Sequence, residues 1–327
     1  MFFENDAVEM IKVGFIGAGD IAYLHGEGVQ ASSNAQLHGI WNRTRTKAEE
    51  KASLFDTRVF DTAEELIEAV DVVYVLTNME THHAYCMQAI EAGKHVLVEK
   101  PTAVTIEEIE EIKAFAHQKG VQIAPVHNYI YEAPVMRAKE MIESGKLGDL
   151  VSLHVLYNIH HPEEVAARYP GVIRQILTHH AYCTLYLVGQ PELVSCMKAT
   201  VNDGSVPQEN LAMVTMKMRN QALSHLCASF AADDHAGDPW TFMIKVIGTK
   251  GATRYSYRDW VENPPAVVHS QTYSAYPYTI RSVGQYFLEQ VIGNQRPPLS
   301  SLDDAITCMK IIEACEQSVE EQRHISI

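Results

Sequence analysis

The sequence is short of cysteine and lacks long apolar runs. Its six cysteines, in a chain of 327 residues, include no C-x-x-C pair, which is typical of free thiols in a reducing compartment rather than a disulfide framework. No apolar run approaches the roughly 18 residues of a membrane span. The opening segment 1–10 is acidic, without the basic start of a secretion signal. We expect a cytoplasmic protein with a short disordered lead-in.

Positive charge is also scarce. The chain has 26 basic against 41 acidic residues, a formal net charge of −15. Such a surface repels phosphate backbones and anionic lipid, so we expect neither nucleic acid nor membrane partners. The composition, 46% hydrophobic and 20% charged, is that of a globular protein. The length favours two domains, which we place at 1–126 and 127–327.

The first 126 residues alternate between short apolar runs and amphipathic segments. The runs that predict strands are 11–16, 36–41, 57–60, 71–76, 95–98 and 121–126. The segments that predict helices are 20–31, 46–54, 62–69, 81–92 and 105–119. Regular alternation of strand and helix predicts a doubly wound parallel sheet, the α/β Rossmann architecture.

The pattern changes after about residue 150. Predicted strands follow one another at 151–158, 192–201, 211–218, 222–231, 241–247, 252–257 and 266–273, and helices stand apart at 173–188 and 302–321. This order indicates an α+β domain with a large, mainly antiparallel sheet that is open on one face. Segment 212–218 is apolar on parts of both faces. That favours contact between sheets in a homodimer or homotetramer, with scattered surface apolar residues as the alternative.

A glycine motif follows the first predicted strand. Gly17, Ala18, Gly19, Asp20, Ile21 and Ala22 form G-x-G-x-x-A between a strand and a helix. The first glycine allows a tight turn, the second allows a pyrophosphate to approach the backbone, and the helix N-terminus faces the phosphates. The motif therefore predicts a dinucleotide site, to which we assign residues 17–21.

The end of the second predicted strand bears on the choice of cofactor. An acidic residue usually stands about 20 residues past this motif and binds the ribose of NAD. Here the position is Asn42, followed by Arg43. An amide does not repel a 2′-phosphate, and an arginine can pair with one. We therefore expect NADP to be preferred over NAD. The alternative is that Arg43 and Arg45 are solvated and that both cofactors are accepted.

The fifth long strand ends in Glu99-Lys100-Pro101. Ligands of open α/β sheets bind at the carboxyl edge, where this lysine stands. A lysine in that position can donate to a substrate hydroxyl or take its proton.

Several segments together resemble the Gfo/Idh/MocA oxidoreductases, the relatives of glucose–fructose oxidoreductase and inositol dehydrogenase. The matching segments are 14–22, 77–82, 92–101, 128–134, 247–252 and 282–295 with 302–321. Asn78 and Met79 replace the usual Pro and Asn, and Ile130 stands where arginine is common. The resemblance implies hydride transfer between nicotinamide and a carbon that bears a hydroxyl on a sugar, sugar derivative or cyclitol.

The resemblance also implies site residues. It carries the catalytic lysine to Lys100 and the histidine of a D-x-x-x-H pair to His179, with Gln175 at the aspartate position. Gln175 can orient a hydroxyl but cannot take a proton. The remaining residues that it implies for the cofactor are Thr77, Asn78, His82, Glu99, Lys100 and Asn128.

Two other functions stay open. Because Gln175 replaces an aspartate, the chain could be a cofactor-sensing regulatory or binding protein that has lost catalysis. It could also be a relative that cleaves glycosides with a retained NAD. We expect no metal site, since adjacent histidines such as His179 and His180 face different directions.

Overall fold

The computed structural model describes residues 10–162, 166–167, 170–201, 208–232, 240–256 and 276–327. The chain forms two compact units. Unit 1 comprises Met1–Asn128 and Thr279–Ala305, and unit 2 comprises Tyr129–Tyr278 and Ile306–Ile327. Unit 1 thus takes in a segment that the sequence placed with the second domain. The domain boundary between 126 and 127 stays a prediction.

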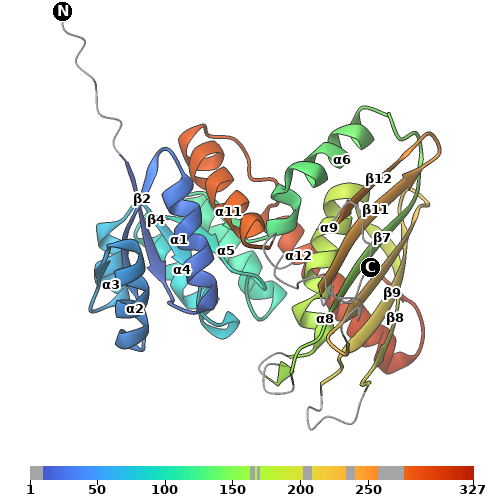
Figure 1. The fold of residues 1–327 in the computed structure, drawn as a ribbon, viewed down its shortest axis with the longest axis horizontal. Coiled ribbons are helices and arrows are strands. Elements are labelled where there is room, and N and C mark those ends of the chain that lie inside the picture. The colour runs from blue at the N-terminus through green and yellow to red at the C-terminus, as the bar shows by residue number, and fades with distance from the viewer. Residues whose placement is uncertain (1–9, 163–165, 168–169, 202–207, 233–239, 257–275) are drawn as a thin grey trace, which may run out of the picture. The chain divides into compact units, whose positions relative to one another are not determined.

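Unit 1 contains a six-stranded parallel sheet with the order β3-β2-β1-β4-β5-β6 (Figure 1). Its strands are β1 (Ile11–Ile16), β2 (Ala35–Trp41), β3 (Arg58–Val59), β4 (Val72–Val75), β5 (His95–Val98) and β6 (Ile123–Pro125). Its helices include α1 (Asp20–Ala31), α2 (Arg45–Phe55), α3 (Ala63–Ala69), α4 (His82–Glu91) and α5 (Ile106–Lys119). The order 3-2-1-4-5-6 is that of the Rossmann fold. The predicted doubly wound parallel sheet is confirmed.

Local chemistry explains why these elements form. All four residues of β4 are buried, as expected for a strand covered on both faces. Helix α5 begins with a capping box in which Thr105 and Glu108 each accept from the other's backbone N–H. It ends at Gly120, whose φ of 68° suits a left-handed cap.

Unit 1 is completed by a segment from near the end of the chain. This segment holds most of α11 (Tyr276–Tyr286) and a π-helix at Phe287–Gly293. The Asn34 side chain donates to the Leu288 carbonyl at 3.0 Å, and the Ser33 N–H donates to Glu289 at 3.1 Å. Contacts between residues more than 250 positions apart therefore build part of unit 1.

Unit 2 contains a seven-stranded sheet in the order β12-β11-β7-β10-β9-β8-β13. The strands are β7 (Leu150–Ile159), β8 (Pro191–Ala199), β9 (Leu211–Met218), β10 (Leu223–Ser229), β11 (Trp240–Gly248), β12 (Ala252–Ser256) and β13 (Ile325–Ser326). Among the strand pairs of the described residues, β7 and β10 alone are parallel. The predicted mainly antiparallel sheet is confirmed, whereas the predicted strand at 266–273 lies outside the described residues.

The helices of unit 2 are α6 (Ala133–Glu143), α8 (Val172–Gln175), α9 (Leu177–Val188) and the larger part of α12 (Leu302–Glu321). The sequence did not predict α6. The helix predicted at 173–188 is broken at Ile176, where the His179 N–H bonds to the Ile176 carbonyl instead of the carbonyl four residues back. Among the described residues, no helix has the length and apolar character needed to cross a membrane.

The two faces of the seven-stranded sheet differ. Alternate residues of β9 are buried, and α9 contacts β7 and β10 from that side (Figure 1). On the opposite face the strand register aligns an apolar row across five strands. The row consists of Met243, Leu156, Cys227, Met213 and Met197, and we call it the open-face row. Met213 is 47% exposed and Met197 77% exposed.

Candidate active site

The glycine turn of unit 1 has the shape that a pyrophosphate requires. Gly17 has a φ of +115°, and a Cβ there would lie 2.7 Å from the Leu76 carbonyl oxygen, so only glycine fits. A Cβ on Gly19 would enter open space. Gly19 is the N-cap of α1 and has no side chain that could accept a hydrogen bond from the first N–H groups of the helix. The first N–H groups of α1 and the space before them therefore fit an anionic phosphate group.

Asn42 connects the end of β2 to this turn. Its Oδ1 accepts from the Ala18 N–H at 3.1 Å, and its Nδ2 donates to the Thr44 carbonyl at 2.9 Å. The two nearby arginines differ. Arg45 pairs with Glu49 and Asp61, whereas exposed Arg43 forms no ion pair with any residue that the structure describes.

His82 joins two turns at the carboxyl edge of the sheet. The side chain is 1% exposed. Its Nε2 lies 2.9 Å from the carbonyl oxygen of Thr77, which follows β4, and its Nδ1 lies 2.9 Å from that of Pro101, which follows β5. Asn78 precedes a 3-10 turn at Met79–Thr81, and its carbonyl accepts from the Thr81 hydroxyl. His82 thus holds two backbone turns, the one after β4 that carries Thr77 and the one after β5 that carries Lys100.

Lys100 stands directly after β5, between Glu99 and the cis-bonded Pro101. Glu99 is 9% exposed, and both of its oxygens are engaged. Oε1 lies 3.0 Å from Nε2 of His25, and Oε2 accepts from the Lys100 N–H at 3.0 Å. Burial alone would raise the pKa of the Glu99 carboxyl. The hydrogen bond and charge of His25, followed by the charge and backbone N–H of Lys100, hold that pKa below its usual value.

Two further residues follow β6. His127 is 2% exposed, and its Nδ1 lies 2.6 Å from the Ser300 hydroxyl. Burial, and then the positive charge of Lys100, lower the pKa of His127 to about 3. The side-chain amide of Asn128 donates to the Thr279 hydroxyl.

In unit 2, a tyrosine positions the ring of His179. His179 is 4% exposed, and its Nδ1 lies 2.7 Å from the Tyr182 hydroxyl. The same hydroxyl oxygen accepts from the Tyr129 N–H at 3.3 Å. Burial raises the pKa of Tyr182 well above its usual value, so it stays a neutral phenol. Sequence reasoning missed Tyr182, although a tyrosine three residues after the histidine lies on the same helix face.

The residues around His179 are firmly held. Arg174 forms a two-pronged ion pair with Glu316 of α12, at 2.6 Å for each contact. This pair fixes α8, which ends at half-buried Gln175.

His180 is fully buried, and burial lowers its pKa to about 3. Neither of its ring nitrogens has a partner among the described residues.

The structure gathers the predicted residues into two sets. In unit 1, the glycine turn, Asn42, Thr77, Lys100 and Asn128 follow parallel strands β1, β2, β4, β5 and β6 in turn, so they share the carboxyl edge of one sheet. In unit 2, Gln175 and His179 belong to α8 and α9. The roles of these residues stay predictions.

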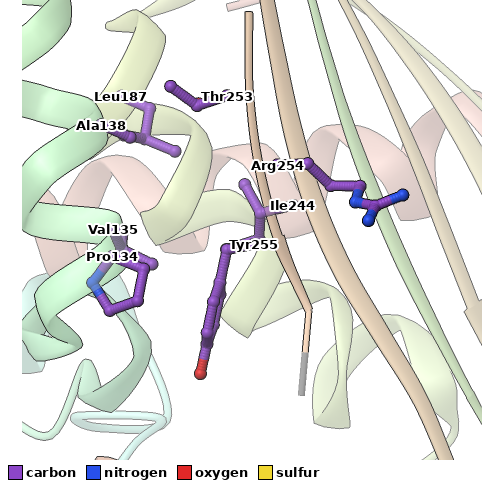
Figure 2. A pocket seen from close by; sticks show the side chains of 8 residues that line it. All are labelled: Pro134, Val135, Ala138, Leu187, Ile244, Thr253, Arg254 and Tyr255. Atoms are coloured by element: carbon purple, nitrogen blue, oxygen red, sulfur yellow. The ribbon is translucent and has the colours of Figure 1, made fainter. Parts of the chain in front are cut away.

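A small cavity lies elsewhere in unit 2, between α6, α9, the edge strand β12 and its neighbour β11 (Figure 2). Its lining consists of Pro134, Val135, Ala138, Leu187, Ile244, Thr253, Arg254 and Tyr255. Figure 2 shows the Arg254 side chain pointing away from the others, as strand alternation requires. The volume of about 20 Å³ has room for one water molecule and not for a sugar. Among the described residues, no group of three metal-binding side chains occurs.

Comparison with known proteins identifies both parts of the chain. A family model described as the oxidoreductase family with an NAD-binding Rossmann fold, GFO_IDH_MocA, matches residues 11–127. A model described as the GFO/IDH/MocA C-terminal domain matches residues 135–254.

Individual proteins agree with these models. The chain is 33% identical over 198 residues to scyllo-inositol 2-dehydrogenase (NADP(+)) of Bacillus subtilis, a match that covers 58% of this chain and 54% of that protein. It is 25% identical over 263 residues to glucose-6-phosphate 3-dehydrogenase of Bacillus subtilis, covering 75% and 74%. The crystal structure of a probable dehydrogenase from Thermotoga maritima superimposes with a TM-score of 0.87 at 20% identity, covering 97% and 98% of the chains. That likeness shows the shared fold.

Proposed function

This chain belongs to the Gfo/Idh/MocA oxidoreductase family, and from that premise we propose that it is an NAD(P)-dependent dehydrogenase or reductase. The hydride moves between nicotinamide and a carbinol or carbonyl carbon of a sugar, a sugar derivative or a cyclitol. One observation carries the proposal: Lys100 follows β5 at the same sheet edge as a glycine turn that fits a pyrophosphate. The names of the relatives, which act on an inositol and on a sugar phosphate, support the substrate class.

The dinucleotide is held by unit 1. Residues 17–21 bind the pyrophosphate, and Thr77, Asn78, His82, Glu99, Lys100 and Asn128 complete the site. We propose that NADP is preferred, with NAD as the second cofactor. Asn42 brings no negative charge toward a 2′-phosphate, and Arg43 is an exposed cation beside it. The NADP(+) in the name of the 33% identical relative supports this preference.

The chain's own residues manage the proton and the substrate oxygen. The bound nicotinamide supplies the hydride chemistry. In the oxidation direction, His179 takes the proton of the substrate hydroxyl, because a neutral imidazole is a base near pH 7. Lys100 donates a hydrogen bond to the same oxygen and stabilises the charge that develops on it. Tyr182 holds the His179 ring, and Gln175 positions the substrate by hydrogen bonding.

Compartment and assembly belong to the same proposal. We place the protein in the cytoplasm, as a homodimer or homotetramer associated through the open-face row, without nucleic acid or membrane partners. The six cysteines, which form no disulfide, support the cytoplasmic location, and the formal charge of −15 supports the absence of nucleic acid and membrane partners. The exposed methionines of the open-face row support association.

A single-turnover absorbance assay tests the proposed activity. Stoichiometric protein is mixed with NADP⁺ or NAD⁺ and with a panel of hexoses, amino sugars and inositols, and the reduced nicotinamide band is followed. We expect a band with at least one compound and a faster one with NADP⁺. Lys100→Met and His179→Ala are each expected to slow it roughly 10²–10⁴-fold. Variants that react as fast as wild type would contradict the assigned roles.

Gln175 also favours a second candidate, a cofactor-sensing protein without catalysis, since a carboxylate is absent from that position. Cofactor binding measured by calorimetry, with no band across the panel, would support this candidate. A cofactor that co-purifies and never exchanges would instead support a glycoside-cleaving relative with a retained NAD.

A further inference from the structure

A buried histidine supports the turn that carries Lys100. We propose that His25 is a positioning residue, which holds the Glu99 carboxylate so that Lys100 keeps its proton and acts as a donor to the substrate oxygen. This inference rests on the proposed function, because it concerns how Lys100 works there. The resemblance implies a cofactor contact for Glu99, and the sequence predicts no role for His25.

The position of His25 is set by its packing. It lies in the second turn of α1, on the face that packs on the sheet, and is 1% exposed. Its ring meets those of Phe15 and Tyr74 edge-on, with centroids 6.5 and 5.6 Å away. These rings restrict its rotation and direct Nε2 at Glu99 Oε1, 3.0 Å away. The same helix begins at the glycine turn, so α1 links the phosphate site to the E-K-P turn.

The contacts of His25 also show which of its nitrogens acts. Nδ1 is buried and has no partner among the described residues. Nε2, 3.0 Å from Oε1, is therefore the nitrogen that holds the Glu99 carboxylate by a hydrogen bond. The carboxylate places a negative charge at the turn.

That charge lies next to Lys100. The second oxygen of Glu99 accepts the backbone N–H of Lys100 itself, which fixes the carboxylate beside the lysine. Two other titratable groups of the described residues lie around the turn, His127 and His82. Burial and then the charge of Lys100 lower the pKa of His127, and His82 contacts the Pro101 carbonyl. Glu99 is the anion among these four residues. A buried anion favours the charged form of a neighbouring ammonium, so Lys100 is the donor and His179 the base.

The test measures the titration of Lys100 without requiring turnover. Competitive labelling of lysines with acetic anhydride at a series of pH values, read by mass spectrometry, reports where Lys100 loses its proton. Three variants are compared with wild type. Glu99→Gln keeps the shape and removes the charge, His25→Phe fills the ring space without a donor, and His25→Gln restores an N–H donor. His83→Phe is the matched control, because His83 and Glu111 form the same kind of pair on the surface at 2.9 Å.

We expect Lys100 to titrate about one pH unit or more lower in Glu99→Gln and His25→Phe. In His25→Gln and His83→Phe it should titrate as in wild type. With an accepted substrate, the two disruptive variants should lose kcat about tenfold or more, and His25→Gln should recover most of it.

An unchanged titration of Lys100 in Glu99→Gln overturns the inference, even if His25→Phe fails to fold. A His25→Phe variant that only unfolds at lower temperature, with normal Lys100 labelling, also overturns it, since that is a purely structural role. If the wild-type protein reduces no nicotinamide with any compound, the proposed function fails, while the labelling still decides whether His25 and Glu99 control Lys100.

Discussion

The side-chain oxygen of Asn42 accepts a hydrogen bond from the backbone N–H of Ala18, 3.1 Å away. The end of β2 is thereby attached to the turn between β1 and α1. An aspartate could accept the same hydrogen bond and would add a negative charge beside Arg43. This position can therefore change cofactor choice without changing the turn.

Asn42→Asp should shift cofactor preference from NADP toward NAD. The added carboxylate repels a 2′-phosphate and can bind a ribose 2′-hydroxyl. We expect the ratio of kcat/KM for NADP⁺ over NAD⁺ to fall by about tenfold or more, which corresponds to about 1.4 kcal/mol. Arg45→Ala is the control, because Arg45 already pairs with Glu49 and Asp61. An unchanged ratio in Asn42→Asp would disprove the role of this position.

Tyr182→Phe should weaken catalysis without weakening substrate binding. The change removes the hydroxyl that lies 2.7 Å from Nδ1 of His179 and keeps the packing of the ring. A less well oriented base should lower kcat by roughly tenfold and leave KM nearly unchanged. Tyr186→Phe, one turn further along α9, is the matched control. Equal kcat values for the two variants would show that the Tyr182 hydroxyl is dispensable.

Two buried histidines should make the fold sensitive to acid. Burial lowers the pKa of His127 and of His180 to about 3, whereas in the unfolded chain both titrate near 6.5. Between these values the unfolded chain binds more protons, so stability falls as the pH falls from about 6.5 toward 3. At pH 5 each histidine should cost about 2 kcal/mol relative to pH 7.5.

His180→Met tests this dependence by urea unfolding at pH 5 and 7.5. Neither ring nitrogen of His180 has a partner among the described residues, so removing the ring loses no hydrogen bond to them. The stability difference between the two pH values should shrink by about 2 kcal/mol. His117→Phe, exposed on α5, should leave it unchanged. The same pH dependence in His180→Met and wild type would refute the assignment.

Met213→Lys should dissociate the proposed oligomer. Met213 lies in the middle of the open-face row, opposite Cys227 on one side and Met197 on the other. A charge buried there without a partner is costly, so light scattering should show a smaller particle than for wild type. Leu54→Lys on α2, which is also exposed, should not change the mass. If both variants keep the wild-type mass, association does not use this face.

Much of unit 1 follows from local sequence. Short apolar runs such as 72–75 become strands because both sheet faces are covered, and the glycine turn has its conformation because a Cβ on Gly17 would collide with the Leu76 carbonyl. Regular alternation with helices then makes these strands parallel. The fold class and the family, together with the positions of Lys100 and His179 on their elements, could accordingly be read from residues that are neighbours in the chain.

What the sequence could not supply depends on contacts between distant residues. The segment 279–305 joins unit 1 through partners such as Ser33 and Glu289, which are 256 positions apart. His25 and Glu99 are separated by 74 positions, and no sequence motif around either residue predicts their contact. Sequence alone determined most elements of unit 1 and helix starts such as the capping box of α5, because propensity, periodicity and capping are local; it did not determine α6 or the break at Ile176. Tertiary structure alone decided which buried polar groups meet, because their hydrogen-bond partners come from residues that are far apart in the chain.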